Sequence, residues 1–250
     1  MRVDVFFAPS LVMPAELGSR VVAIVDVLRA STSIAVALSN GARAVIPLAS
    51  SEEVVSRGKS LARSEVRLAG ERKMQPIPGF DFGNSPLEFS REAVEGKTIL
   101  MSTTNGTAAV LAVQAGGARD IVVASYVNFS AVLGMLRSGL RAGTDVAIVC
   151  AGHDRHFALE DAACAGLFVQ HITTKHTKAE VNDAAQAAMV LNKKYGTNLK
   201  RLFRSSMHGQ ALAEAGFGED LVACAELDAY AVLPVYQDRQ ITKGATEPSH

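Results

Sequence analysis

The sequence predicts an α/β protein of three layers, in which helices cover both faces of a largely parallel or mixed sheet and the C-terminal half is rich in helix. Short β-branched runs alternate with alanine-rich helical patterns as far as Cys150. The runs are continuously apolar, which is typical of strands that are covered on both faces. Alternation of strand and helix favours parallel pairing, because each helix carries the chain back across the sheet.

Six apolar runs are predicted to be strands, and four segments between them are predicted to be helices. The strands are "VDVFF" (3–7), "VVAIVDV" (21–27), "AVIPLA" (44–49), "KTILM" (97–101), "DIVVAS" (120–125) and "DVAIVC" (145–150). The helices are "STSIAVALSNG" (31–41), "SEEVVSRGKSLARS" (51–64), "NGTAAVLAVQAGG" (105–117) and "NFSAVLGMLRSG" (128–139). Ser or Asn can cap the free amides at a helix start, and Gly near the end favours termination.

The second half of the chain has a different pattern. After Cys150 the sequence predicts helix after helix from Leu159 to about Ala225. A last apolar run, "AYAVLPVY" (229–236), is predicted to return as a strand. Pro234 favours an edge position or a strand end, because proline has no amide proton to give to a sheet ladder.

Residues 1–240 are predicted to form one domain, followed by a polar tail at 241–250. The connection 69–89 shows little regular structure in its sequence, and long loops in compact domains are more often functional than accidental. A boundary between two sub-lobes is therefore considered near 70–90.

Charge and composition indicate which classes of binding partner are disfavoured for this chain, such as nucleic acids and membranes. Lys+Arg and Asp+Glu number 25 each, so no net field favours nucleic acid or an anionic membrane. Aromatic residues make up 6%, Trp is absent, and no apolar run is long enough to span a bilayer. The three Cys are widely spaced and form neither a metal clip nor an even disulfide set. We therefore expect a cytoplasmic protein with no nucleic-acid or membrane partner; a homodimer is compatible with this architecture.

Polar residues gather directly after the predicted strands. The carboxyl ends of parallel strands open onto a crevice where ligands bind, and hydroxyls with free helix amides suit a bound oxyanion. The relevant stretches are "DVLRASTS", "GNSP", "STTNGT" and "SYVNFS". The candidate anion-binding residues in them are Ser31, Thr32, Asn84, Ser85, Thr103, Thr104, Asn105, Gly106, Thr107 and Asn128.

Asp26 and Arg29 are the leading candidates for chemistry. A carboxylate at the end of a buried strand can ligate a divalent cation or attack a phosphorus centre. The alternative for Asp26 is a helix cap or a partner for Arg29. Arg29 offers a planar fork that suits phosphate, sulfonate or carboxylate, although structural ion pairs of arginine are equally common.

The stretch "CAGHDRHFALEDAACAG" carries further candidates. Glu160 and Asp161 lie at a predicted helix start, where the helix dipole also favours acids for structural reasons. Neighbours on a helix do not share a face, so we expect one acid to enter the site and the other to cap or pair. Cys150 is a candidate nucleophile. His153 and His156 are candidate metal ligands or proton carriers, but they lack zinc-protease spacing, so solvated loop histidines are favoured.

Known phosphate-site motifs are absent. The loop of cysteine phosphatases needs a longer spacing than the four residues between Cys150 and Arg155. Leu28 occupies the position where the two-aspartate phosphatase motif requires its second Asp. Neither GxxxxGK[ST] nor GxGxxG occurs, so nucleotide binding by those routes has no support.

Five blocks, in order, resemble the 2-phosphosulfolactate phosphatase family, often called the ComB family. They are "DVLRASTS", "AGERK…PGFDFGNSP", "STTNGT", "ASYVNFSAV" and "VCAGHDRHFALEDAACAG". The likeness runs from about Val21 to Val235 and includes "SSMHGQALAEAGFGEDLVACAELD". By this resemblance Arg72, in the second block, joins the expected substrate-binding residues. Ala158 departs from the family pattern, which usually has a Ser-type helix cap there.

The resemblance implies a magnesium-dependent phosphatase that converts 2-phosphosulfolactate to sulfolactate and phosphate, a step of coenzyme M biosynthesis. Asp26, with Glu160 or Asp161, would hold Mg²⁺, and Arg29 with the neutral donors would orient the anion. Water, Asp26 or Cys150 would attack phosphorus. The alternatives are a phosphatase of another phosphorylated hydroxy acid, a non-catalytic binder of small phosphate or sulfonate anions, and an isomerase or lyase acting on a similar anion.

Overall fold

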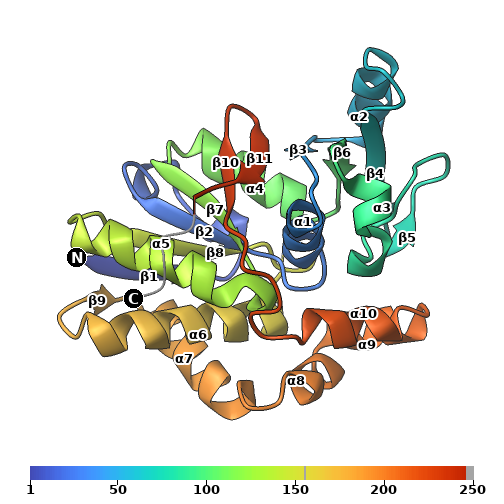
Figure 1. Cartoon of the computed structure of the whole chain (residues 1–250). Helices are drawn as coiled ribbons and strands as arrows, with labels where there is room; N and C mark the ends of the chain where they lie inside the picture. The colour runs from blue at the N-terminus through green and yellow to red at the C-terminus, as the bar shows by residue number, and fades with distance from the viewer. Residues whose placement is uncertain (155, 246–250) are drawn as a thin grey trace.

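The computed structural model describes residues 1–154 and 156–245. In this part of the chain, one mixed sheet has the strand order β5-β4-β6-β3-β11-β10-β7-β2-β8-β1-β9 (Figure 1). The strands are β1 (Arg2–Phe6), β2 (Val21–Val25), β3 (Ala44–Pro47), β4 (Val66–Arg72), β5 (Gln75–Pro76), β6 (Thr98–Ser102), β7 (Asp120–Ala124), β8 (Val146–Cys150), β9 (Glu180–Val181), β10 (Pro234–Gln237) and β11 (Gln240–Lys243). The α-helices are α1 (Ala30–Ser39), α2 (Ser51–Lys59), α3 (Arg91–Val94), α4 (Gly106–Ala115), α5 (Phe129–Arg141), α6 (Leu159–Lys175), α7 (Asp183–Tyr195), α8 (Leu199–Ser205), α9 (Met207–Glu214) and α10 (Gly218–Cys224). The predicted α/β class is confirmed.

The sheet consists of two parallel groups joined by an antiparallel hairpin. Strands β7, β2, β8, β1 and β9 are parallel neighbours, and β3, β6 and β4 form the other parallel group. The hairpin of β10 and β11 lies between them, antiparallel to β7 on one side and to β3 on the other. Because all the parallel strands of one group end at the same edge, the loops that follow β2, β7 and β8 leave the sheet side by side.

Strand β2 shows why the molecule has three layers. Its side chains alternate between the two faces of the sheet, as strand geometry requires. Val21, Ala23 and Val25 pack into one apolar core, whereas Val22 and Ile24 pack into the other. Helices α5 and α6 cover the first core, and α1 and α4 cover the second. Apolar residues on both faces of one strand therefore require helices on both sides of the sheet.

Helices α6 to α10 make up most of the C-terminal half, as predicted, with the short strand β9 between α6 and α7. Figure 1 shows α7, α8, α9 and α10 along the bottom of the view. The last predicted strand is β10, which lies inside the sheet. Pro234 is the first residue of β10, so this proline occupies a strand end and not an edge strand.

Two segments differ from the expected pattern. Val66–Arg72 forms β4, which overlaps the start of the connection 69–89. Polar Arg67 and Gly70 interrupt the apolar run of β4, so the strand had no continuous apolar signature. Gln240–Lys243 forms β11, which includes the start of the predicted polar tail. Residues 246–250 of that tail lie outside the described residues, and the sub-lobe boundary near 70–90 stays a prediction.

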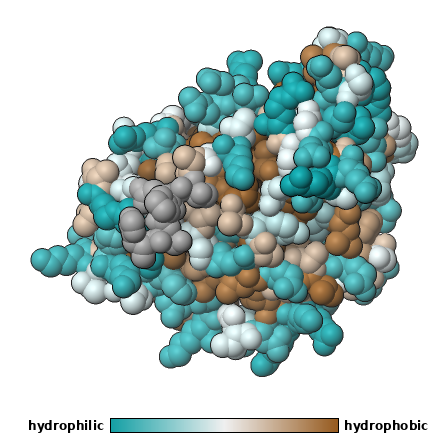
Figure 2. Space-filling model, in the orientation of Figure 1, coloured by the Kyte–Doolittle hydropathy of each residue, from teal (hydrophilic) through white to brown (hydrophobic). Residues whose placement is uncertain are grey.

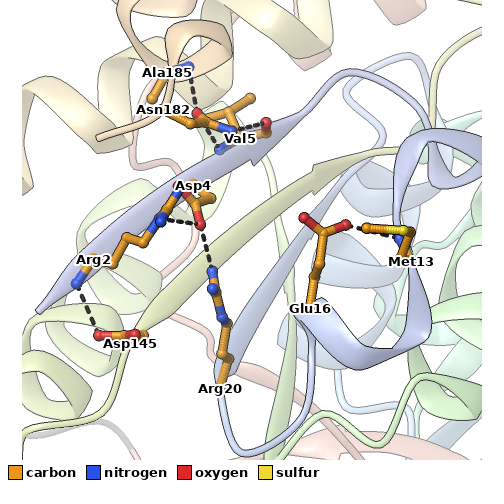
Figure 3. Close-up of polar contacts among 9 residues, drawn as sticks. All are labelled: Arg2, Asp4, Val5, Met13, Glu16, Arg20, Asp145, Asn182 and Ala185. Carbon is orange, nitrogen blue, oxygen red and sulfur yellow. Dashed lines mark hydrogen bonds and ion pairs between the residues drawn. The ribbon is translucent and has the colours of Figure 1, made fainter. Parts of the chain in front are cut away.

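The amino edge of β1 is fixed by side chains (Figure 3). Buried Asp4 accepts hydrogen bonds from Arg2 Nε at 2.9 Å and from Arg20 Nη1 at 2.7 Å. Farther along β1, the Asn182 amide donates to the Val5 carbonyl at 2.9 Å and accepts from the Val5 amide at 3.1 Å. Asn182 thus takes the place of a strand partner where β9 has ended.

In the described part of the chain, no helix is both long enough and apolar enough to cross a bilayer. On the face shown in Figure 2, hydrophilic residues are interspersed with smaller groups of hydrophobic ones.

Candidate active site

A cavity of about 550 Å³ lies beyond the carboxyl ends of strands from both parallel groups of the sheet. Its lining comes from the ends of β2, β4, β6 and β8 and from helix α9. The lining residues are Asp26, Leu28, Arg29, Glu71, Arg72, Lys73, Met74, Asn84, Thr103, Thr104, Asn105, His153, Asp154 and His208. A second cavity, of about 520 Å³ beside Arg119 and Arg239, contains none of the predicted site residues. The carboxyl-edge cavity is therefore the candidate active site.

Asp26 follows β2 and lies between two helix starts. Its Oδ1 accepts a hydrogen bond from the amide of Ala30, the first residue of α1, at 3.2 Å. On the other side, Gly106 begins α4, and a Cβ at Gly106 would lie 2.6 Å from Asp26 Oδ2. Glycine is thus needed at position 106 so that α4 can approach the carboxylate this closely. Helix N-termini favour negative charge, which partly offsets the burial of Asp26.

The charge on Asp26 is costly despite these helix ends. The pKa of Asp26 is raised to about 6, chiefly by burial; His208 and the Ala30 amide act to lower it, whereas nearby Glu71 and Glu160 add to the increase. Ionising several of these neighbouring carboxyl groups at once is therefore unfavourable in a buried site. Such a site gains stability from a bound cation or from a proton held close to the carboxylates.

The threonine loop after β6 is held together by its own hydroxyls. Thr103 Oγ1 accepts from the Thr107 amide, and Thr107 Oγ1 accepts from the Thr103 amide, both at 3.1 Å. Glu71, from β4, accepts from the Thr104 amide at 2.7 Å and from the Met74 amide at 3.1 Å. The carboxylate of Glu71 therefore joins the threonine loop to the turn after β4, and both its oxygens are occupied by backbone amides.

Arg29 lies in the cavity lining but does not pair with Asp26. Its Nη1 donates to Asp220 Oδ2 at 2.7 Å, and its Nη2 donates to the Met74 carbonyl at 3.0 Å. The guanidinium carbon lies 4.3 Å from the centre of the Phe217 ring. The alternative of a surface arginine or an Asp26 partner is therefore not found: Arg29 is buried and its ion pair is with Asp220, far away in the sequence.

Two asparagines and Arg72 complete the polar lining. Asn84 Oδ1 is buried and has no hydrogen-bond partner among the described residues, so it is open to a ligand. Asn105 Oδ1 accepts from the Asp154 amide at 3.2 Å. Arg72 is exposed, and its Nη2 donates to Ser102 Oγ at 3.0 Å. Arg72 and the neighbouring Lys73 place positive charge at the cavity.

Glu160 lies directly behind a histidine of the cavity lining. Its Oε1 is 3.3 Å from His208 Nδ1, and its Oε2 is buried without a hydrogen-bond partner in the described chain. The His208 ring stacks on His153, with 4.1 Å between ring centres. Burial lowers the pKa of His153, and neighbouring His208 lowers it further. His153, expected to be solvated, is thus partly buried against His208, which the sequence did not single out.

Asp161 has a structural position although it is adjacent to Glu160. Its Oδ1 accepts from the Val27 amide at 2.9 Å, and its Oδ2 accepts from the Gly152 amide at 3.0 Å. It thereby ties the loop after β2 to the loop after β8. Burial raises the pKa of Asp161 well above its usual range, with Asp26 and Glu160 contributing. Glu160 and Asp161 point in different directions, as adjacent helix residues do: Glu160 lies against His208, and Asp161 bonds backbone amides.

Several predicted site residues point into the protein and not into the cavity. Thr32 Oγ1 donates to the Val27 carbonyl, Ser31 Oγ accepts from the Asp26 amide, and Ser85 Oγ donates to Asp220. Asn128 bonds only backbone groups, and Cys150 is fully buried. Burial raises the pKa of the Cys150 thiol well above its usual range, which disfavours a thiolate.

The cavity lining also includes residues that sequence reasoning did not select. They are Leu28, Glu71, Lys73, Met74, Asp154 and His208. Glu71 and His208 both occur within blocks that carry the family resemblance. Each is a single polar residue in a predicted loop or helix, however, and local pattern does not distinguish it from a solvated residue.

The site suits a weakly coordinated cation better than a closed metal centre. Over residues 1–154 and 156–245, no group of three or more His, Cys, Asp or Glu side chains is placed to hold a metal ion. Mg²⁺ usually binds through one or two carboxylates and keeps water and substrate oxygens as its other ligands. Asp26, in the cavity lining, fits such a requirement. Glu160 Oε2 is an unpartnered oxygen behind His208, whereas both Asp161 oxygens are occupied.

Comparison with known proteins gives one family. The family model for 2-phosphosulpholactate phosphatase matches residues 6–239. A probable 2-phosphosulfolactate phosphatase of Symbiobacterium thermophilum is 41% identical over 90% of this chain and 95% of that protein. Proteins with the same description from Clostridium beijerinckii and Thermotoga maritima are 32% and 36% identical, over 97% and 93% of this chain and 99% and 94% of their own lengths. These matches extend across both halves of the sheet and the C-terminal helices.

Proposed function

Because the chain belongs to the 2-phosphosulfolactate phosphatase family, an enzyme family of phosphoric monoester hydrolases, we propose that it hydrolyses 2-phosphosulfolactate to sulfolactate and phosphate. The observation that carries the proposal is one cavity in which Asp26, Arg29, Asn84 and Asn105 meet. A volume of about 550 Å³ accommodates a three-carbon molecule with several anionic groups.

The polar lining suits a substrate with more than one anion. Arg29 and Arg72 come from different strand ends, so they can contact separate anionic groups. The side-chain amides of Asn84 and Asn105 add neutral donors to the same lining, and Lys73 adds charge next to Arg72 in the sequence. Fixed donors that are already in place stabilise charge developing at phosphorus without reorganising during the reaction.

Asp26 is the acid nearest the chemistry in this proposal. Its Oδ1 is fixed by the Ala30 amide, so Oδ2 is the oxygen that acts in the cavity. Asp26 and Glu160 would hold Mg²⁺, which supplies Lewis-acid polarisation of the phosphoryl oxygens when bound. Net hydrolysis adds water across the ester P–O bond and releases the alcohol. Water and Asp26 remain the candidate nucleophiles, since the raised pKa and full burial of Cys150 do not support a thiolate.

Phosphate release from purified protein tests the proposal. With 2-phosphosulfolactate and Mg²⁺ we expect steady release, and with EDTA a loss of about 10²-fold or more, the scale of Lewis-acid stabilisation. Reactions on 2-phospholactate, which lacks the sulfonate, and on p-nitrophenyl phosphate serve as controls. Equal kcat/KM on all three esters would contradict the sulfonated substrate, and unchanged release in EDTA would contradict the magnesium requirement.

A further inference from the structure

The guanidinium of Arg29 is held from three directions by residues distant in the sequence. Asp220, on α10, accepts from Nη1 at 2.7 Å, and the Met74 carbonyl accepts from Nη2 at 3.0 Å. The ring of Phe217, at the start of α10, covers one face of the guanidinium at 4.3 Å. An arginine on flexible bonds is thereby confined to one orientation at the cavity.

Asp220 is itself fixed. Its Oδ1 accepts from Ser85 Oγ at 2.6 Å, while Oδ2 bonds Arg29, so both oxygens are engaged. The side chains of Arg29 and Asp220 are only 2% and 3% exposed. Buried ion pairs contribute little net stability because of their desolvation cost. A contribution to stability is therefore a weak explanation of why a buried Arg29–Asp220 ion pair lies beside the cavity.

We propose that Asp220 is a positioning residue that aims the Arg29 guanidinium at the anionic substrate. A guanidinium has five N–H donors, and among the described residues Asp220 and Met74 each take one. The remaining donors keep a fixed direction because the occupied ones are anchored. The inference rests on the proposed function, since it assumes that Arg29 contacts the substrate.

The arrangement also sets the electrostatics of the contact. Asp220 offsets the charge of buried Arg29, so the guanidinium acts on the substrate through directed hydrogen bonds more than through net charge. Misplacement of such a group by about 1 Å can cost about 10²-fold in rate. Any effect of an Asp220 substitution on the reaction rate must then act through Arg29, so we expect no such effect when Arg29 is absent.

A double-mutant cycle tests this route. Asp220→Asn keeps the size of the side chain, and we expect it to lower kcat/KM for 2-phosphosulfolactate by about 10²-fold. In an Arg29→Ala background the same change is expected to have less than about a twofold further effect, because the two residues act as one unit. Glu219→Gln is the matched control, since Glu219 is an exposed acid on the same helix. It should leave kcat/KM unchanged.

Equal effects of Asp220→Asn with and without Arg29, or an equal loss in Glu219→Gln, would overturn the proposal. If Asp220→Asn fails to fold, Phe217→Leu replaces it in the cycle. A loss of kcat/KM in Phe217→Leu that is equally large in the Arg29→Ala background would then overturn the proposal. Arg29→Ala with wild-type kcat/KM would also overturn it, because Arg29 would then not act on the substrate. The proposed function fails separately, by an absence of phosphate release when the wild-type protein meets 2-phosphosulfolactate and Mg²⁺.

Discussion

Two neighbouring loops look alike in sequence and differ in what they do. The segment 26–33 runs from the end of β2 into the first turn of α1, and the segment 125–128 follows the adjacent parallel strand β7. Both carry hydroxyl or amide side chains after an apolar strand. Asn128 bonds the Ser125 amide and the Val123 and Val232 carbonyls, so its polar groups are used internally. The segment 26–33, by contrast, presents Asp26 and Arg29 to the cavity.

The contrast teaches that polar loops at a sheet edge are not all binding loops. A buried polar group must be hydrogen-bonded, and small hydroxyl or amide side chains meet this need for backbone groups at a strand end. Thr32 and Ser125 serve this purpose together, with 2.8 Å between their hydroxyl oxygens. Of the two segments, only the one after β2 contributes side chains to the cavity lining, and these are the charged Asp26 and Arg29 with Leu28. Substitutions whose effects on activity and on stability differ can test which polar residues bind the substrate and which only support the backbone.

The largest expected effect is on Asp26. Asp26→Asn keeps the shape and removes the charge, so we expect kcat/KM to fall by about 10³-fold. Stability should rise, because burial and neighbouring acids raise the pKa of Asp26 from 3.8 to about 6 in the folded protein, and ionising it there costs roughly 3 kcal/mol. Steady-state kinetics and urea unfolding at pH 8 measure the two effects.

The pH dependence gives the control for Asp26. A folded-state pKa above the unfolded value means that the folded state binds the proton more tightly, so wild-type stability falls as pH rises from about 3.8 to about 6. The stability advantage of Asp26→Asn should therefore shrink below pH 6 and vanish near pH 4. Activity near wild type at saturating Mg²⁺ would refute the role of Asp26.

An intermediate effect, on stability alone, is expected for Asn128. Asn128→Ala leaves buried backbone groups without partners and should lower the free energy of unfolding by about 2–3 kcal/mol, with kcat/KM within about threefold. Asn40→Ala is the comparison, because Asn40 donates only to the Phe89 carbonyl and should cost about 1 kcal/mol. A selective loss of kcat/KM in Asn128→Ala would place this loop in the binding site after all.

The smallest effect is expected for Cys150. Cys150→Ala removes a buried sulfur and should lower the free energy of unfolding by about 1 kcal/mol, with kcat within about twofold. Cys164→Ala, at another fully buried thiol, should behave in the same way. A nucleophile would respond differently, since its loss removes catalysis by several orders of magnitude. Comparing kcat for the two variants decides whether Cys150 takes part in the reaction.

Sequence pattern alone predicted the α/β class, which the structure confirms, because the class depends on local periodicity. It also placed a candidate site after the strands, where Asp26, Arg29, Asn84 and Asn105 line one cavity. It also predicted that Glu160 and Asp161 would diverge, since adjacent residues on a helix point to different sides. The strand β4 was missed because a polar residue and a glycine interrupt its apolar run. Glu71 and His208 were missed because an isolated polar residue has no local signal of burial.

The amino-acid order determined where strands and helices form, since backbone propensity and apolar spacing act over a few residues. Only the tertiary structure decided which polar groups remain available. Asp220 lies 191 residues from Arg29 and Ser85 lies 135 residues from Asp220, yet these three side chains form one buried network. The reason is physical: a hydrogen-bond partner is defined by distance and direction in space, and chain folding alone brings such distant residues together.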